Sequence, residues 1–258
     1  MSGYYLYGFV PEDTPAPDLT GLNDNAVEIV VRHGVGVVTE PVDPAAFQRA
    51  LHQHLDDPPW LAEQALHHEH VVGQFLDVGI CPLRFATLIP DWQGLEPLLA
   101  RQAEHVQHTL DQLRGLREWT LRVWVRRDAH ESAVLADPGL QAEQQALSSA
   151  TGGKAYLLKR KFEQGLEQAR KRALLQLHDR LSDDLAARCD DYQHPDRRPD
   201  DDPEHLGVLE LVCLLGDARE QSLRDHLATL AADHGLVSDL SGPFAPYHFV
   251  DLDLSGTA

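Results

Sequence analysis

Stretches in which apolar and polar residues alternate predict several β-strands in the first half of the chain. The clearest lies at residues 118–126, where every second side chain is apolar. Such alternation is typical of a sheet with one face on a core. Glycines at 34 and 36 separate two of the strands, which predicts a hairpin. The predicted strands cover residues 4–10, 27–31, 35–39, 80–89 and 118–126.

Apolar residues spaced three or four apart predict helices between these strands. The helices are expected at residues 44–54, 59–76 and 92–113. Asp43 and Asp91 precede two of them and can cap their first turns. With its sheet and the helices on one side, the first half fits an α+β sandwich of ferredoxin-like type.

The second half opens with a helical pattern at residues 128–145 that is broken at Pro138 and Gly139. A long helix follows from about residue 154 to 188, with its apolar ladder at 158, 162, 166, 169, 173, 177, 181 and 185. Acidic residues and prolines dominate 194–205, which predicts a solvated, mobile loop.

The rest of the second half predicts a strand at 206–215, a helix at 217–233 and strands at 236–240 and 247–252. The fold class is therefore α+β with mainly antiparallel sheet. We expect an N-terminal domain of residues 1–128. The C-terminal domain, residues 129–258, would contain the long helix and the acidic loop.

Composition narrows the classes of function. The formal net charge is −19, which disfavours binding to nucleic acid or an anionic membrane. Three cysteines are widely separated in sequence, as is typical of free thiols in a reducing cytoplasm. We see neither a signal peptide at the N-terminus nor a run of the ~18–20 apolar residues that span a membrane. We therefore expect a cytoplasmic protein.

Four short segments, in order along the chain, resemble the GvpL/GvpF family of gas vesicle proteins. They are residues 5–10 (YLYGFV), 82–87 (PLRFAT), 153–157 (GKAYL) and 242–250 (GPFAPYHFV). The pair Glu118-Trp119 also fits the family pattern. Two departures are local: Ala86 replaces a usual glycine, and Phe244-Ala245 replaces a usual Trp-Pro pair.

The resemblance implies two modified ferredoxin-like domains and a non-enzymatic role in forming gas vesicles. The protein would be an accessory or minor structural component at the gas vesicle, in contact with the wall protein and with other accessory proteins. Self-association stays open, and the F-type and L-type paralogues are not distinguished. The sequence lacks a P-loop, a Rossmann glycine pattern and a nucleophile elbow, so we expect no cofactor and no catalytic residue.

Six residues are candidates for protein contacts. Arg84 is a charge inside an apolar run and must be paired or reach water: its head would meet a carboxylate such as Glu118 or Asp77, or solvent, or it would form an ion pair across an interface. Trp124 lies on the polar side of its strand, where it anchors a contact or is covered by a helix or by the second domain. The other four belong to a basic cluster on the long helix: Arg160, Lys161, Arg170 and Lys171.

Two other functions are weighed against protein contact. A metal-dependent enzyme could use His67 and His70, which are three residues apart on a helix; however, Val72 stands where an HExxH motif needs its second histidine. A nucleic-acid-binding regulator could use the basic helix at 159–172. Glutamates within that helix favour intrahelical ion pairs instead.

Overall fold

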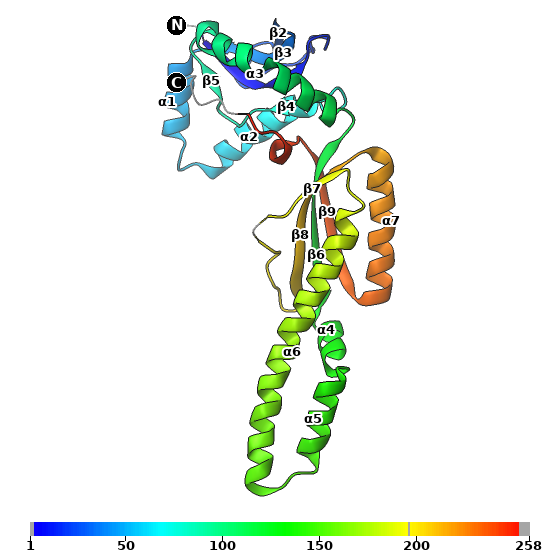
Figure 1. Ribbon diagram of the computed structural model, residues 1–258. Helices are drawn as coiled ribbons and strands as arrows, with labels where there is room; N and C mark the ends of the chain where they lie inside the picture. Colours follow the sequence, from blue (N-terminus) through cyan, green and yellow to red (C-terminus); the bar gives the residue numbers. More distant parts are fainter. Residues whose placement is uncertain (1–2, 196, 253–258) are drawn as a thin grey trace. The chain divides into compact units, whose positions relative to one another are not determined.

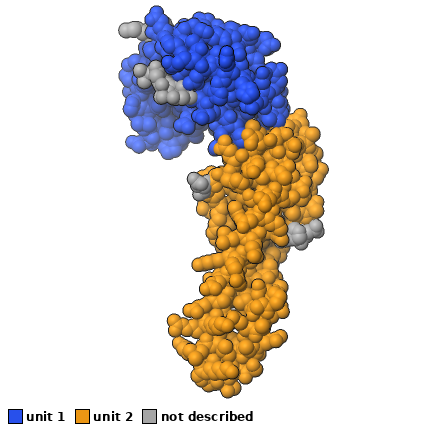
Figure 2. Space-filling model, in the orientation of Figure 1, with its two compact units in different colours: residues 1–118, 243–258 blue, residues 119–242 orange. Residues whose placement is uncertain are grey.

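The computed structural model describes residues 3–195 and 197–252. The chain forms two compact units, shown in Figures 1 and 2. Unit 1 comprises residues 1–118 and 243–258, and unit 2 comprises residues 119–242. This division differs from the predicted boundary after residue 128, because the chain leaves unit 1 ten residues earlier and returns to it near its C-terminus.

An antiparallel sheet forms the centre of unit 1, with the order β2-β3-β1-β4 and with β5 also paired to β1. The predicted hairpin is confirmed: His33 and Gly34 have φ of 49° and 74° in the turn between its strands. The strands of this sheet are β1 (Gly3–Pro11), β2 (Glu28–Arg32), β3 (Val35–Val42), β4 (Cys81–Pro82) and β5 (Leu88–Ile89).

Helices cover both faces of β1, so this strand is buried almost throughout. On one face, Tyr5 and Tyr7 pack in a core with residues of α1 (Pro44–Gln53) and α2 (Pro58–Gly73). On the other, Tyr4 contacts Trp92 of α3 (Trp92–Leu113), with ring centroids 4.8 Å apart. The predicted caps are confirmed, since the Asp43 carboxylate accepts hydrogen bonds from the first turn of α1 and Asp91 does the same for α3.

The predicted strand at residues 80–89 is wrong in its middle. The chain pairs with β1 only through β4 and β5, and a turn lies between them. Thr87 closes this turn by donating its N–H to the Arg84 carbonyl, and Ala86 has a left-handed φ of 66°. The apolar run reflects burial against β1 rather than a continuous strand.

The sheet of unit 2 has the order β7-β8-β6-β9. Helices connect β6 to β7 and β8 to β9, which gives the β-α-β-β-α-β element order of a ferredoxin-like fold. Strand β6 was predicted in the N-terminal domain, but it pairs with β8 and β9 and so belongs to unit 2. The strands are β6 (Arg117–Arg126), β7 (Asp191–Gln193), β8 (His205–Leu215) and β9 (Leu236–Phe244).

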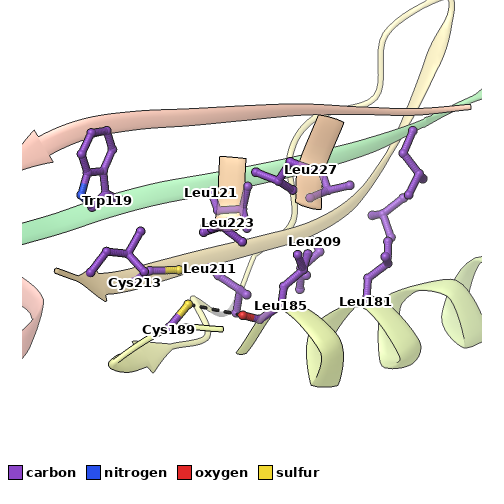
Figure 3. Close-up of a cluster of buried hydrophobic side chains, with 14 of the residues drawn as sticks. Trp119, Leu121, Leu181, Leu185, Cys189, Leu209, Leu211, Cys213, Leu223 and Leu227 are labelled. Atoms are coloured by element: carbon purple, nitrogen blue, oxygen red, sulfur yellow. Dashed lines mark hydrogen bonds between the residues drawn. The ribbon is translucent and has the colours of Figure 1, made fainter. Parts of the chain in front are cut away.

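Two helices bury the apolar side of this sheet, α6 (Gly152–Ala186) and α7 (Asp217–His234). Leu185 of α6 and Leu223 of α7 are fully buried against Leu121 and Leu211 of the strands (Figure 3). The alternation in residues 118–126 is thereby confirmed, because the apolar set of β6 faces this core.

The N-terminal part of α6 runs beyond the sheet and pairs with α5 (Pro138–Ser148), as Figure 1 shows. We call this helical hairpin the arm. A small core holds it to α4 (Arg127–Leu135): Ala169 packs with Val134 and Leu140. The predicted break at Pro138 and Gly139 is confirmed as the start of α5, where Asp137 is the N-cap.

Of the predicted loop at residues 194–205, residue 196 lies outside the described residues, and residues 197–205 lie along the polar face of the sheet. The Trp124 indole N–H donates to the Asp200 carbonyl at 3.1 Å, and Pro199 is buried. Arg197 and Arg122 both bind the buried carboxylate of Glu210. The segment thus has specific contacts; its mobility remains a prediction.

The predicted final strand at residues 247–252 is wrong. Tyr247–Phe249 form a single 3₁₀ turn, and residues 250–252 pair with no described strand. Side-chain contacts hold this segment in place of a sheet ladder: Ala245 is buried in the core of unit 1, and both Tyr247 and His248 bond to side chains there.

Candidate interaction site

The arm places one long face of α6 in solvent. A helix of 35 residues is about 52 Å long, and its sheet-proximal half alone packs on the sheet. In the arm, the inward side chains are those of Phe162, Leu166 and Ala169, which match the predicted apolar ladder. Successive residues turn by about 100°, so the ladder fixes which side chains point away.

The outward side chains form a stripe at intervals of three or four residues. Leu157 and Leu175 mark its ends and are 68% and 62% exposed. Tyr156, at 68% exposure, borders it. We call this set the outer stripe of α6; its members are Leu157, Arg160, Gln164, Gln168, Lys171 and Leu175.

Two residues of the predicted basic cluster stabilise the arm. The Arg170 guanidinium donates to Glu131 of α4 at 2.7 and 2.9 Å and also pairs with Glu167. Lys161 reaches Glu143 of α5 at 2.9 Å. These charges bind within unit 2, so the structure gives them an internal role.

The other two basic candidates are available to a partner. Arg160 and Lys171 are exposed, and neither forms an ion pair with a carboxylate in the described part of the chain. The neighbouring acids are already engaged, because Glu163 lies 3.9 Å from Lys159 and Glu167 binds Arg170. The outer stripe therefore carries unpaired positive charge between two exposed leucines.

A cleft of about 700 Å³ lies at the base of the arm, between α4 and α6. Arg170 and Lys171 line it, together with Arg127 and the buried His130. Most of its charges are satisfied internally: Arg127 donates to the Asp202 carbonyl and lies near Asp201, and Arg170 binds Glu131. The cleft offers little free charge to an ionic ligand.

The remaining two candidates are placed differently from each other. Arg84 is exposed in the turn between β4 and β5, and its head meets solvent rather than Asp77 or Glu118. Trp124 is half-buried under residues 197–200, so it is covered, but by a loop of its own unit rather than by a helix or by the other unit. Arg84 belongs to unit 1, whereas the other five candidates belong to unit 2.

Unit 1 contains a buried polar network centred on His68. The Tyr5 hydroxyl donates to Nδ1 of His68 at 2.8 Å, and Nε2–H faces the Leu83 carbonyl at 3.1 Å. These partners fix the neutral Nε2–H tautomer. Burial lowers the pKa of His68 to about 4 because the charged imidazolium would lose its hydration. Tyr247 joins the network, with its hydroxyl donating to Glu69 at 2.7 Å.

Two further buried carboxylates in unit 1 are fully engaged. Glu40 accepts from the Tyr7 hydroxyl at 2.9 Å and from the backbone N–H of Asn23 at 3.3 Å. Glu118 accepts from the backbone N–H of His248 at 3.0 Å and lies 2.8 Å from its ring Nδ1. Three of the four segments that carry the family resemblance therefore meet in unit 1. Residues 153–157 lie outside it, at the start of α6, as does Gly242 at the end of unit 2.

Sequence reasoning missed the roles of His68 and of the two exposed leucines, although signals existed. His68 lies three or four residues from Ala65 and Val72, on the apolar face predicted for α2. Leu157 and Leu175 do not belong to the apolar ladder of α6.

The two histidines of the metal-enzyme alternative are not brought together: His67 bonds to the Thr20 carbonyl and His70 is exposed. Across the described residues, no group of three or more His, Cys, Asp or Glu could hold a metal ion.

Comparison with known proteins places these features in a family. The family model described as gas vesicle synthesis protein GvpL/GvpF matches residues 3–251. The chain belongs to the GvpL/GvpF family. The predicted membership is thus confirmed, and the protein is one involved in gas vesicle formation.

Two characterised relatives cover most of the chain. Gas vesicle protein L1 of Halobacterium salinarum is 25% identical over 96% of this chain and 90% of its own length. Gas vesicle protein L of a Streptomyces species is 29% identical over 86% and 83%, respectively. The GvpL/GvpF family is not a known enzyme family, and membership associates this chain with other gas vesicle proteins and with the gas vesicle.

A solved structure supports the fold. The crystal structure of the gas vesicle protein GvpF from an Anabaena species superposes with a TM-score of 0.68 at 20% identity, covering 98% of this chain and all of the other. The α+β fold with two antiparallel sheets is thereby confirmed. Within the described residues, none of the helices is long and apolar enough to cross a membrane.

Proposed function

We propose that this protein acts in gas vesicle formation as a non-enzymatic accessory or minor structural component, by contact with the wall protein or with other accessory proteins. The outer stripe of α6 is the surface that makes this contact. The contact would be made in the cytoplasm, at the growing vesicle. Nucleating the wall, keeping subunits from aggregating and being incorporated into the wall are all forms of this one contact role.

The physical need for such a contact is clear. Amphipathic wall subunits expose apolar surface before they polymerise, and exposed apolar surface aggregates in water. A folded acidic protein that covers this surface reversibly would hold subunits apart, since its net charge of −19 keeps the complex soluble.

One observation carries the proposal: α6 exposes Leu157 and Leu175 on the same face, flanking unpaired cations. By contrast, Phe162, Leu166, Ala169 and Ala173 of α6 point inward and pack in the small core of the arm. Leaving two large apolar side chains in water loses the stabilisation of burial, about 1.5–3 kcal/mol each. A surface that binds a partner recovers that stabilisation upon binding.

The test is made in a strain lacking the chromosomal copy. The strain is complemented with wild type, with Leu157→Asp/Leu175→Asp, or with a Leu66→Asp control, because Leu66 is 70% exposed on α2 of unit 1. We expect the stripe variant to lose capture of gas vesicle proteins and to form few vesicles, while the control retains both. Normal vesicles and normal capture with a folded stripe variant would contradict the proposal.

A further inference from the structure

We propose that the outer stripe of α6 binds an acidic amphipathic helix of its partner, lying lengthwise along α6. This inference rests on the proposed function and specifies the chemistry of the partner. Three features of the stripe lead to it: its length, its charge and its incompatibility with a second copy of itself.

The length of the stripe suits a helix. Leu157 and Leu175 are 18 residues apart, which is five turns or about 27 Å along α6. The residues between them recur every three or four positions and so share one face of the helix; they are polar, which leaves apolar contact to the two ends. A partner helix of about 20 residues with apolar side chains near both ends would contact both leucines at once.

The charge of the stripe selects an acidic helix. Arg160 and Lys171 are its charged members, both exposed and both lacking a carboxylate partner among the described residues. No acid lies in the stripe, although the whole chain carries 41 acids against 22 basic residues. Glutamates or aspartates that flank the apolar seam of the partner would pair with these cations.

A second copy of the chain is a poor occupant. If two α6 helices paired antiparallel so that Leu157 met Leu175, Arg160 would face Arg172 and Lys161 would face Lys171. If the two helices paired in parallel, each cation would lie beside the same cation of the other copy. Like charges opposed in this way are destabilising.

The experiment uses the full-length protein and a synthetic helical peptide of 20 residues. Its leucines repeat every three or four positions over 18 residues, and glutamates flank them. A matched peptide carries lysines in place of the glutamates. Fluorescence anisotropy measures both affinities at low and high salt. We expect the acidic peptide to bind at least ~10-fold more tightly than the basic one, and to weaken as salt rises.

Matched variants assign the binding to the stripe. Arg160→Glu/Lys171→Glu should lower the affinity for the acidic peptide by at least ~10-fold. Arg49→Glu/Arg101→Glu makes the same change in net charge at two exposed arginines of unit 1, and it should leave the affinity within about twofold. Circular dichroism verifies that each variant is folded.

Three results would overturn the inference: equal affinity for the two peptides, an equal effect of the two charge-reversal pairs, or a dimer in sedimentation that Leu157→Asp/Leu175→Asp dissociates. The proposed function fails separately, by the complementation test. If that leucine variant abolishes vesicles while the acidic peptide shows no preference for the stripe, the contact role stands and the acidic helix is wrong.

Discussion

Unit 1 buries charged and polar side chains, whereas the arm of unit 2 exposes apolar ones. In unit 1, Glu40 and His68 are fully inaccessible and Glu118 nearly so, and each has hydrogen-bond partners. In the arm, Leu157 and Leu175 stand in solvent. Hydrogen bonds stabilise the buried groups of unit 1. For the two leucines of the arm, the proposed function supplies a binding partner that covers them.

The comparison separates residues that stabilise the fold from residues that are available to a partner. A buried carboxylate that accepts several hydrogen bonds specifies how its neighbours pack, so the network of unit 1 fixes the turn between β4 and β5 and the C-terminal segment in place. An exposed leucine does not constrain how the rest of its own chain packs. Substitutions in the two regions should therefore change different observables: stability in unit 1 and in the core of unit 2, and binding in the arm.

The largest effect is expected within α6 itself. Leu185→Ala removes a fully buried side chain from the core of unit 2 and should cost about 2–5 kcal/mol. Leu175→Ala, ten residues earlier on the same helix, should change the free energy of unfolding by less than about 0.5 kcal/mol. Urea denaturation measures both. If Leu175→Ala were as damaging as Leu185→Ala, the stripe would be part of the fold and not a binding surface.

Much of α6 could be predicted from sequence because helical periodicity reports burial directly. The ladder from residue 158 to 185 located the inward face, and with it both cores that the helix meets. Sequence could not separate Arg170 from Lys171, two adjacent basic residues whose side chains leave the helix in different directions. Arg170 reaches Glu131 on α4, a residue 39 positions away, so its pairing depends on tertiary structure.

The next effect is a dependence of stability on pH. His68 has its pKa lowered to about 4 by burial, against about 6.5 in the unfolded chain. The fold thus favours the neutral ring; its contribution is complete above pH 6.5 and is lost as the pH falls towards 4. A shift of this size corresponds to about 3 kcal/mol. Denaturation midpoints between pH 7 and 4 measure the loss.

The comparison with His68→Gln isolates this group. Glutamine keeps polar atoms near Tyr5 and the Leu83 carbonyl but does not titrate, so the variant should lose stability less steeply over the same range. Other titrating groups act in both proteins and cancel in the difference. Parallel pH profiles would mean that His68 is not buried in the neutral form in solution.

Errors in the predicted fold fall where tertiary contacts outweigh local pattern. Residues 80–89 and 247–252 are apolar enough to resemble strands, yet both are held by hydrogen bonds to distant residues. The Ala86 N–H donates to the Tyr5 hydroxyl, and Tyr247 bonds to Glu69. Strand β6 was predicted correctly as an element but with the wrong sheet, since periodicity does not specify strand partners.

The smallest effect concerns Ala86, which stands where the family pattern has glycine. Its φ of 66° is left-handed, a conformation that costs a residue with a Cβ about 1–2 kcal/mol. Ala86→Gly relieves this strain but gives the unfolded chain more freedom, which offsets part of the gain. We expect a net increase in stability of about 0.5 kcal/mol, measurable as a higher urea midpoint with an unchanged slope. A loss of stability would mean that packing of the Ala86 methyl group against the core outweighs its strain.

The same variant should leave the pH dependence of stability that His68 causes unchanged, because the turn is fixed by its bond to Tyr5. An unchanged pH profile would show that the backbone strain at Ala86 and the polar network around His68 contribute to stability independently.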